Sequence, residues 1–248
     1  MSICKTVVQE RKRFNTTIDS ILLAGFAKNF AKGFTLDLGT GNGVLPLLLS
    51  DSGKISKVVG IDLNLDTLKV AKNNIETLAL KDRITFLGSD IREVPRLFRP
   101  NSFETVVVNP PYRKMNTGNI SPYFDRAQSC HELVCKLDDV IKAAAHVLKN
   151  KGRFIIVFLP ERLPELMQKL DLYRLAPKTM QMVHPYKDRS CGHVLVCARK
   201  NGALGLETLS PLIIYTRQGE YSPEMLDYYS YSSRFGFQLD KITVSNDR

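Results

Sequence analysis

The chain has 248 residues, of which 44% are hydrophobic and 24% are charged, so it is long enough to bury a core in one large or two small domains. No run of residues is long and apolar enough to cross a membrane, and residues 1–14 lack the apolar centre of a secretory signal peptide, so we expect a cytoplasmic location. The net charge of +10 suggests a polyanionic partner, with simple solubility as the alternative.

The five cysteines are an odd number and form no CxxC pair. Cysteine and histidine come close together twice, within residues 130–135 and 191–197, but neither spacing matches a tetrahedral zinc site. We therefore expect reduced thiols and no bound metal.

Apolar runs of strand type alternate along the chain with segments of helical periodicity. The expected helices cover residues 17–31, 43–50, 65–78, 132–148 and 163–170, and the expected strands cover residues 34–38, 57–63, 84–88, 103–108, 152–159, 179–184 and 193–198. This alternation predicts a parallel sheet between two layers of helices. No helix separates the last two strands, so these should pair antiparallel. The expected fold class is α/β: a seven-stranded, Rossmann-like, mostly parallel sheet with an antiparallel last strand and helices on both faces.

A glycine loop, Asp37-Leu-Gly39-Thr-Gly41-Asn-Gly43, follows the first expected strand. Ligands of open parallel sheets bind at the carboxyl ends of the strands, and glycines let the backbone approach a ligand closely. The spacing is GxGxG, whereas dinucleotide-binding folds carry GxGxxG. A tight strand-to-helix turn without a ligand is the alternative.

Two further acidic residues end the next two strands. Asp62 can accept hydrogen bonds from the hydroxyls of a ribose, and Asp90 from the amino group of an adenine. The predicted site for an adenosine-containing cofactor consists of Asp37, Gly39, Gly41, Gly43, Asp62 and Asp90. For Asp90, the alternative is a helix N-cap.

The tetrapeptide Asn109-Pro110-Pro111-Tyr112 ends the fourth strand. Its prolines are rigid and lack an N–H, and the side-chain oxygen of Asn109 and the carbonyl of Pro110 can both accept from one conjugated NH2 group. Tyr112 offers a ring on which a planar substrate can stack. Together with the glycine loop, the tetrapeptide predicts S-adenosylmethionine-dependent methylation of a planar nitrogen, with residues 109–112 as the catalytic residues. The alternative is a proline-rich exit from the strand.

Further segments carry a more specific resemblance. They are residues 13–23, 37–43, 109–114, 121–127, 131–132, 183–185 and 210–215. In these segments the chain resembles the bacterial tRNA(Val) (adenine-37) N6-methyltransferases, which are class I methyltransferases of the NPPY type. The resemblance covers about residues 10–230. It implies S-adenosyl-L-methionine as cofactor, an adenine of the tRNA anticodon loop as target, and Thr17 and Asp19 closing over the methionine end of the cofactor.

Basic segments should hold the phosphates of that RNA. They include Arg11, Lys12, Arg13, Arg113 and Lys114. We expect residues 1–32 to cover the cofactor site, residues 33–200 to form the catalytic domain, and residues 201–248 to extend that domain with a strand, a short helix and a disordered end.

Three other functions compete with this interpretation. A protein-glutamine N5-methyltransferase uses the same tetrapeptide, but the bacterial enzymes carry a helical domain before the glycine loop, and 36 residues precede Asp37 here. An rRNA adenine-N6 or guanine-N2 methyltransferase fits the charge and the motif equally well. A non-catalytic RNA-binding module is a different class, which the intact Asp37, Asp62 and Asn109 argue against.

Overall fold

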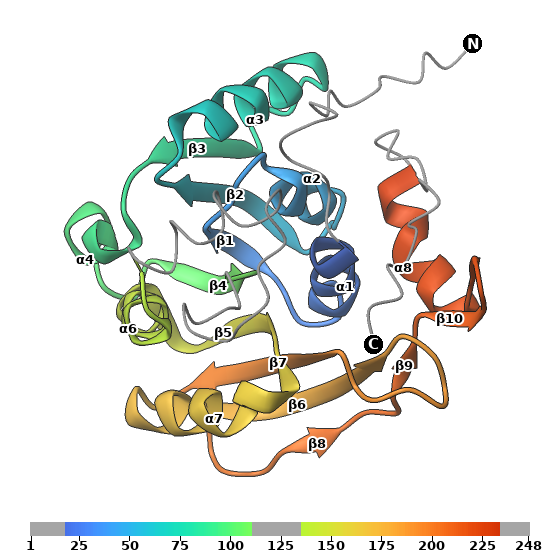
Figure 1. The fold of residues 1–248 in the computed structure, drawn as a ribbon. Helices are drawn as coiled ribbons and strands as arrows, with labels where there is room; N and C mark the ends of the chain where they lie inside the picture. The colour runs from blue at the N-terminus through green and yellow to red at the C-terminus, as the bar shows by residue number, and fades with distance from the viewer. Residues whose placement is uncertain (1–17, 111–134, 234–248) are drawn as a thin grey trace.

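The computed structural model describes residues 18–110 and 135–233 and is built on a twisted central sheet flanked by helices (Figure 1). Its strands are β1 (Gly33–Leu38), β2 (Ile55–Asp62), β3 (Ile84–Gly88), β4 (Phe103–Val108), β5 (Leu148–Phe158), β6 (Leu175–His184), β7 (His193–Lys200), β8 (Glu207–Thr208), β9 (Leu212–Ile213), β10 (Tyr215–Arg217) and β11 (Glu220–Tyr221). Its helices are α1 (Ile18–Ala27), α2 (Val44–Ser50), α3 (Leu65–Thr77), α4 (Val94–Leu97), α6 (Leu137–Val147), α7 (Leu163–Leu172) and α8 (Pro223–Ser233), with short 3₁₀ turns η1 (Ile91–Glu93) and η2 (Pro160–Arg162).

The strand order confirms the expected fold class. The sheet runs β3-β2-β1-β4-β5-β7-β6-β8, with β9 also beside β6. Strands β1 to β5 pair in parallel, and β7 is antiparallel to both of its neighbours, β5 and β6. The chain first builds outward from β1 through β2 to β3 and then continues on the other side with β4. The strand order therefore reverses between β1 and β4, which is where open α/β sheets bind ligands.

The sheet differs from the prediction at its edges. It has nine strands in the described residues, because the short β8 and β9 add to the β6 edge. Strand β5 begins at Leu148 rather than residue 152, since the polar residues 149–152 form a bulge against β4 rather than a separate turn. Helices α1 and α6 begin or end several residues inside the expected ranges.

The two faces of the sheet are covered by different helices (Figure 1). One buried cluster joins α1, α2, α3 and α8 to one face, and a second joins α4, α6 and α7 to the other. Neighbouring strand residues alternate between these clusters, so that Val107 belongs to the first and both Val106 and Val108 belong to the second. This alternation is the period of two that a strand imposes, and both strand faces are apolar because both are covered.

The segment after residue 200 is more elaborate than the single strand and helix that the sequence predicts. It supplies β8 and β9, the hairpin β10–β11 and the helix α8, which lies along α1 (Figure 1). Met225 and Tyr229 of α8 are buried in the same cluster as α1. Residues 234–248, for which we expect disorder, lie outside the described residues.

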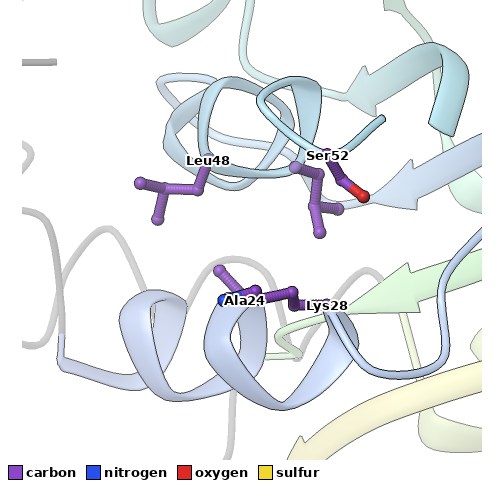
Figure 2. Close-up of a pocket in the computed structure, with 5 residues that line it drawn as sticks. Ala24, Lys28, Leu48 and Ser52 are labelled. Carbon is purple, nitrogen blue, oxygen red and sulfur yellow. The ribbon is translucent and has the colours of Figure 1, made fainter. Parts of the chain in front are cut away.

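A small recess separates the C-terminal ends of α1 and α2 (Figure 2). Its lining is Ala24, Lys28, Leu48, Leu49 and Ser52, and its cavity volume of about 10 Å³ is room for about one water. Both helices meet the glycine-loop edge of the sheet with their other ends, so this recess is separate from the predicted site. In the described part of the chain, no helix has the length and apolar character to span a membrane.

Candidate active site

The predicted site residues converge on one edge of the sheet. Strands β1 to β4 are parallel, so their carboxyl ends share this edge, and strands lie about 4.8 Å apart. Asp37 pairs with Gly60 of β2 and with Val107 of β4. The glycine loop, Asp62 and Asn109 therefore leave three adjacent strands at nearly the same level, on either side of the reversal in strand order.

The three glycines of the loop have positive φ angles, but for different reasons. Gly39 and Gly41 have φ angles of 78° and 55°, and a Cβ on either would meet no atom of the described residues within 4 Å. A Cβ on Gly43 would lie 2.6 Å from the Cζ atom of Phe86 and 2.9 Å from the Cβ atom of Ala71. Gly43 is therefore needed for packing of the loop against α3 and β3, whereas Gly39 and Gly41 border open space.

Asp62 holds the glycine loop in place. Its Oδ2 accepts a hydrogen bond from the backbone N–H of Gly41 at 2.7 Å, and its Oδ1 accepts one from the N–H of Asn64 at 2.8 Å. A carboxylate has about four acceptor positions, so two remain after these bonds. Asp62 can thus shape the loop and still accept from ribose hydroxyls.

Asp37 is a buried carboxyl whose Oδ2 atom accepts no hydrogen bond from the described part of the chain. Only 1% of the residue is exposed. Its pKa is raised from 3.8 to about 7: burial raises it most, the nearby Thr40 hydroxyl partly opposes this, and the negative charge of Asp62 adds to the increase. The Thr40 Oγ1 atom is close enough to act on this pKa but forms no hydrogen bond of good geometry, and it too is buried. Two buried polar atoms that have no hydrogen-bond partner among the described residues fit a ligand group that can donate hydrogen bonds.

Asp90 caps the turn η1. Its side chain accepts a hydrogen bond from the backbone N–H of Arg92 at 2.8 Å, and both of its oxygens bond the Arg92 guanidinium. This hydrogen-bonded guanidinium holds the pKa of Asp90 below its usual range. The N-cap alternative therefore describes its local structure, and a contact with adenine stays a prediction.

The described part of the tetrapeptide lies beside α1. Asn109 is half-buried, and its Nδ2 donates to the Ser20 hydroxyl at 3.4 Å, while Pro110 is buried. The other two members, Pro111 and Tyr112, lie outside the described residues. So do the basic residues Arg11, Lys12, Arg13, Arg113 and Lys114, and Thr17 as well.

Two contacts at this edge were not predicted. Asp19, which we expect to face the methionine end of the cofactor, contacts His193: its Oδ1 lies 3.1 Å from the Nε2 atom of the ring. Its neighbour Ser20 contacts Asn109. Ser20 lies within a segment that carries the family resemblance, but nothing in the sequence indicates that it reaches a residue of β4.

Most of the chain matches the model of a known protein family. The model of the family described as "Methyltransferase domain" matches residues 31–204, which include the glycine loop, Asp62 and Asn109. The chain belongs to this methyltransferase family. The expected class of enzyme, an S-adenosyl-L-methionine-dependent methyltransferase, is thereby confirmed.

Curated relatives of this methyltransferase are similar over most of its length. A tRNA1(Val) (adenine(37)-N6)-methyltransferase of Porphyromonas gingivalis is 28% identical over 214 residues, which cover 83% of each chain. The enzyme of the same name from Pasteurella multocida is 28% identical over 220 residues, which cover 85% of this chain and 88% of the relative. A release factor glutamine methyltransferase of Rhodopirellula baltica is 38% identical, but only over 77 residues, or 25% of its length.

Solved structures agree on the fold. The crystal structure of a predicted O-methyltransferase from Agrobacterium tumefaciens has a TM-score of 0.68 at 20% identity and covers 86% of this methyltransferase and 96% of that chain. Geranyl diphosphate C-methyltransferase from Streptomyces coelicolor, in complex with S-adenosyl-L-homocysteine, has a TM-score of 0.55 at 15% identity, over 72% of this chain and 80% of the other. Among the residues that our structure describes, no group of three or more His, Cys, Asp or Glu side chains is placed to hold a metal ion.

Proposed function

We propose that this methyltransferase transfers a methyl group to the N6 atom of an adenine in tRNA, at position 37 of tRNA(Val). The observation that carries the proposal is the placement of Asn109 and Pro110. They leave β4 next to the glycine loop of β1, so a planar amino group held by them faces the cofactor site across the reversal in strand order.

The cofactor binds through the residues of the glycine-loop edge. Asp62 accepts from its ribose hydroxyls, and the open space at Gly39 and Gly41 takes the part of the ligand that must approach the backbone. Asp37, whose Oδ2 has no hydrogen-bond donor within residues 18–110 and 135–233, is suited to a donor or cationic group of the ligand. S-adenosyl-L-methionine supplies an electrophilic methyl group on a sulfonium.

The protein orients the target nitrogen rather than deprotonating it. The Oδ1 of Asn109 and the carbonyl of Pro110 each accept one hydrogen of the adenine amino group, which turns the nitrogen lone pair out of the ring plane and toward the methyl carbon. When bound, the cofactor would supply the methyl group: the nitrogen would gain an N–C bond, the sulfonium sulfur would keep the electrons of the broken S–C bond, and the extra proton would leave the nitrogen for water. Alignment of this kind supplies a substantial part of the roughly 7–11 kcal/mol by which proximity and orientation can lower the activation barrier.

The choice of tRNA rests on the relatives and on charge. Relatives similar over more than 80% of the chain carry the name tRNA1(Val) (adenine(37)-N6)-methyltransferase. The net charge of +10 suits a polyanionic substrate. A target base must leave its stack to reach such a site, and the loop of an RNA hairpin presents one at little cost. A cytoplasmic location belongs to the same proposal, because tRNA is available there.

The experiment compares acceptors directly. Purified protein and methyl-labelled S-adenosyl-L-methionine are incubated with tRNA from a strain without this enzyme, with ribosomal subunits from that strain, and with an unmethylated release factor. We expect label in tRNA alone, recovered as N6-methyladenosine after nuclease digestion, and no label with Asn109→Ala. Label in ribosomal RNA or in the release factor, with unlabelled tRNA, would contradict the proposal.

A further inference from the structure

The first turn of α1 contacts Asn109, the first residue after β4, although the two lie far apart in the sequence. The Nδ2 atom of Asn109 donates to the Oγ atom of Ser20 at 3.4 Å, between residues 89 positions apart. Ser20 lies one residue from Asp19, whose carboxylate pairs with the His193 ring at the start of β7. One turn of helix therefore connects two strands at the edge that carries the site.

An asparagine can hold a substrate amino group only in one orientation of its amide. The amino group is a donor, so the Oδ1 atom of Asn109 must face it, and the Nδ2 atom must then face an acceptor. The Ser20 hydroxyl is an acceptor within hydrogen-bond distance of that nitrogen. At 3.4 Å the bond is long, and catalytic contacts of this kind tighten when the substrate binds.

Ser20 lies in a helix, α1, that is packed tightly against the rest of the protein. Residues 21–27 of α1 are all buried. The Asp19–His193 pair ties the helix to β7, with 16% of the Asp19 side chain and 22% of the His193 side chain exposed. At the other end of α1, a Cβ on Gly25 would lie 2.3 Å from the ring of Tyr228, so α8 rests directly on the helix. A polar group on a rigid element can hold a second group in a defined orientation.

We propose that Ser20 is a positioning residue: it accepts from the Asn109 amide and so directs the Oδ1 atom of Asn109 toward the target amino group. The inference rests on the proposed role of Asn109 and goes beyond it, because it assigns the orientation of the amide to a residue of α1. Ser20 does not itself touch the cofactor or the base in this proposal.

The first test observes the amide itself. In protein labelled with ¹⁵N-asparagine, the side-chain NH2 signals that vanish in Asn109→Ala belong to Asn109. We expect Ser20→Ala to shift these signals and to speed their exchange with water, whereas Ser20→Thr keeps the acceptor and leaves them near the wild-type position. Ser190→Ala is the matched control, since Ser190 is exposed in the turn between β6 and β7. Unmoved Asn109 signals in Ser20→Ala would overturn the proposal.

The second test measures catalysis on tRNA. We expect Ser20→Ala to lower kcat about ten-fold, as a misaligned contact does, with the KM for tRNA and the Kd for the cofactor within two-fold of wild type. Ser20→Thr should recover most of kcat, and Ser190→Ala should match wild type. An unchanged kcat in Ser20→Ala overturns the proposal. If wild-type protein methylates no RNA, the proposed function fails, and the asparagine signals still decide whether Ser20 holds Asn109.

Discussion

The carboxylate of Asp62 accepts a hydrogen bond from the backbone N–H of Gly41 at 2.7 Å, so the residue that ends β2 fixes the loop that follows β1. The same carboxylate accepts from Asn64, which caps α3. A single side chain therefore sets the positions of the glycine loop and of the next turn. Removing the Asp62 side chain should therefore weaken cofactor binding and lower the stability of the protein together.

Replacing Asp62 with alanine tests this coupling. The substitution leaves the N–H groups of Gly41 and Asn64 without their acceptor, so we expect the free energy of unfolding to fall by about 1–3 kcal/mol. The Kd for S-adenosyl-L-methionine, measured by calorimetry, should rise at least about ten-fold, since one charge-assisted hydrogen bond is worth roughly 1.5–3 kcal/mol. Asp66→Ala is the control, because the Asp66 side chain is 81% exposed and pairs with Lys69 at the surface. Equal effects of the two substitutions would contradict the coupling.

Asp37 should make the stability of the free protein depend on pH. Its pKa is raised from 3.8 to about 7 in the folded protein, chiefly by burial, so the folded state holds this proton more tightly than the unfolded chain does. The free energy of unfolding should therefore fall as the pH rises from about 4 to about 7, by an amount on the order of 1.4 kcal/mol per pH unit at most. Carboxyls such as Asp90 and Glu104 have lowered pKa values, so their contribution to the free energy of unfolding increases as the pH rises, at lower pH than the Asp37 effect. The difference between wild type and Asp37→Asn isolates the Asp37 contribution, and a difference that does not change between pH 4 and 7 would contradict it.

The same carboxyl should make cofactor binding depend on pH. A cationic or donor group of the ligand favours ionised Asp37, so affinity should increase as the pH rises from about 5.5 to about 7.5 through the pKa of about 7. Binding near pH 6 should release a proton, which calorimetry detects as a dependence of the observed enthalpy on the buffer. Asp37→Asn should bind more weakly and show neither effect. If proton release persists in Asp37→Asn, the released proton comes from another group.

The sequence predicted the order of the elements because each apolar run matches one covered strand. It misplaced the start of β6, which begins at Leu175 and includes Pro177. Proline has no backbone N–H to donate, so it argues against a strand. In β6, however, the register with β7 shifts between Pro177 and Thr179, and pairing with β8 begins only at Thr179. The missing N–H thus falls where no neighbouring strand needs it.

The positions of the glycine loop and of Asn109-Pro110 were predictable, because each directly follows an apolar run that forms a strand. Their roles in binding and catalysis stay predictions. Contacts with a partner far along the chain were not predictable. The contacts of Ser20 with Asn109 and of Asp19 with His193 join elements that meet only in the folded sheet. The buried state of Asp37 likewise depends on the packing around it, since a polar residue at the end of a strand is usually solvated.

Substitutions in the glycine loop should separate binding from stability. Gly39 has a φ angle of 78°, and Gly219, in the turn between β10 and β11, has one of 77°. A Cβ at either position meets no atom within 4 Å in the part of the chain that the structure describes. Alanine at either position should cost the same backbone strain, about 1–2 kcal/mol. Only Gly39→Ala should also weaken cofactor binding, because its methyl group occupies the space proposed for the ligand. Equal cofactor affinities of the two variants would show that this space is not used.

The contact between Gly25 and Tyr228 provides the last prediction, which concerns the support of α1. A Cβ on Gly25 would lie 2.3 Å from the Tyr228 ring, and the hydroxyl of that ring bonds the Gln181 side chain at 3.2 Å. Gly25→Ala should therefore force α1 and α8 apart and lower the free energy of unfolding by about 1–3 kcal/mol, even though alanine favours a helix. Removing the ring in Gly25→Ala/Tyr228→Ala should make the added methyl group harmless, so the double variant should be no less stable than Tyr228→Ala alone. Additive losses in this double-mutant cycle, followed by chemical denaturation, would mean that α1 and α8 do not meet at this point.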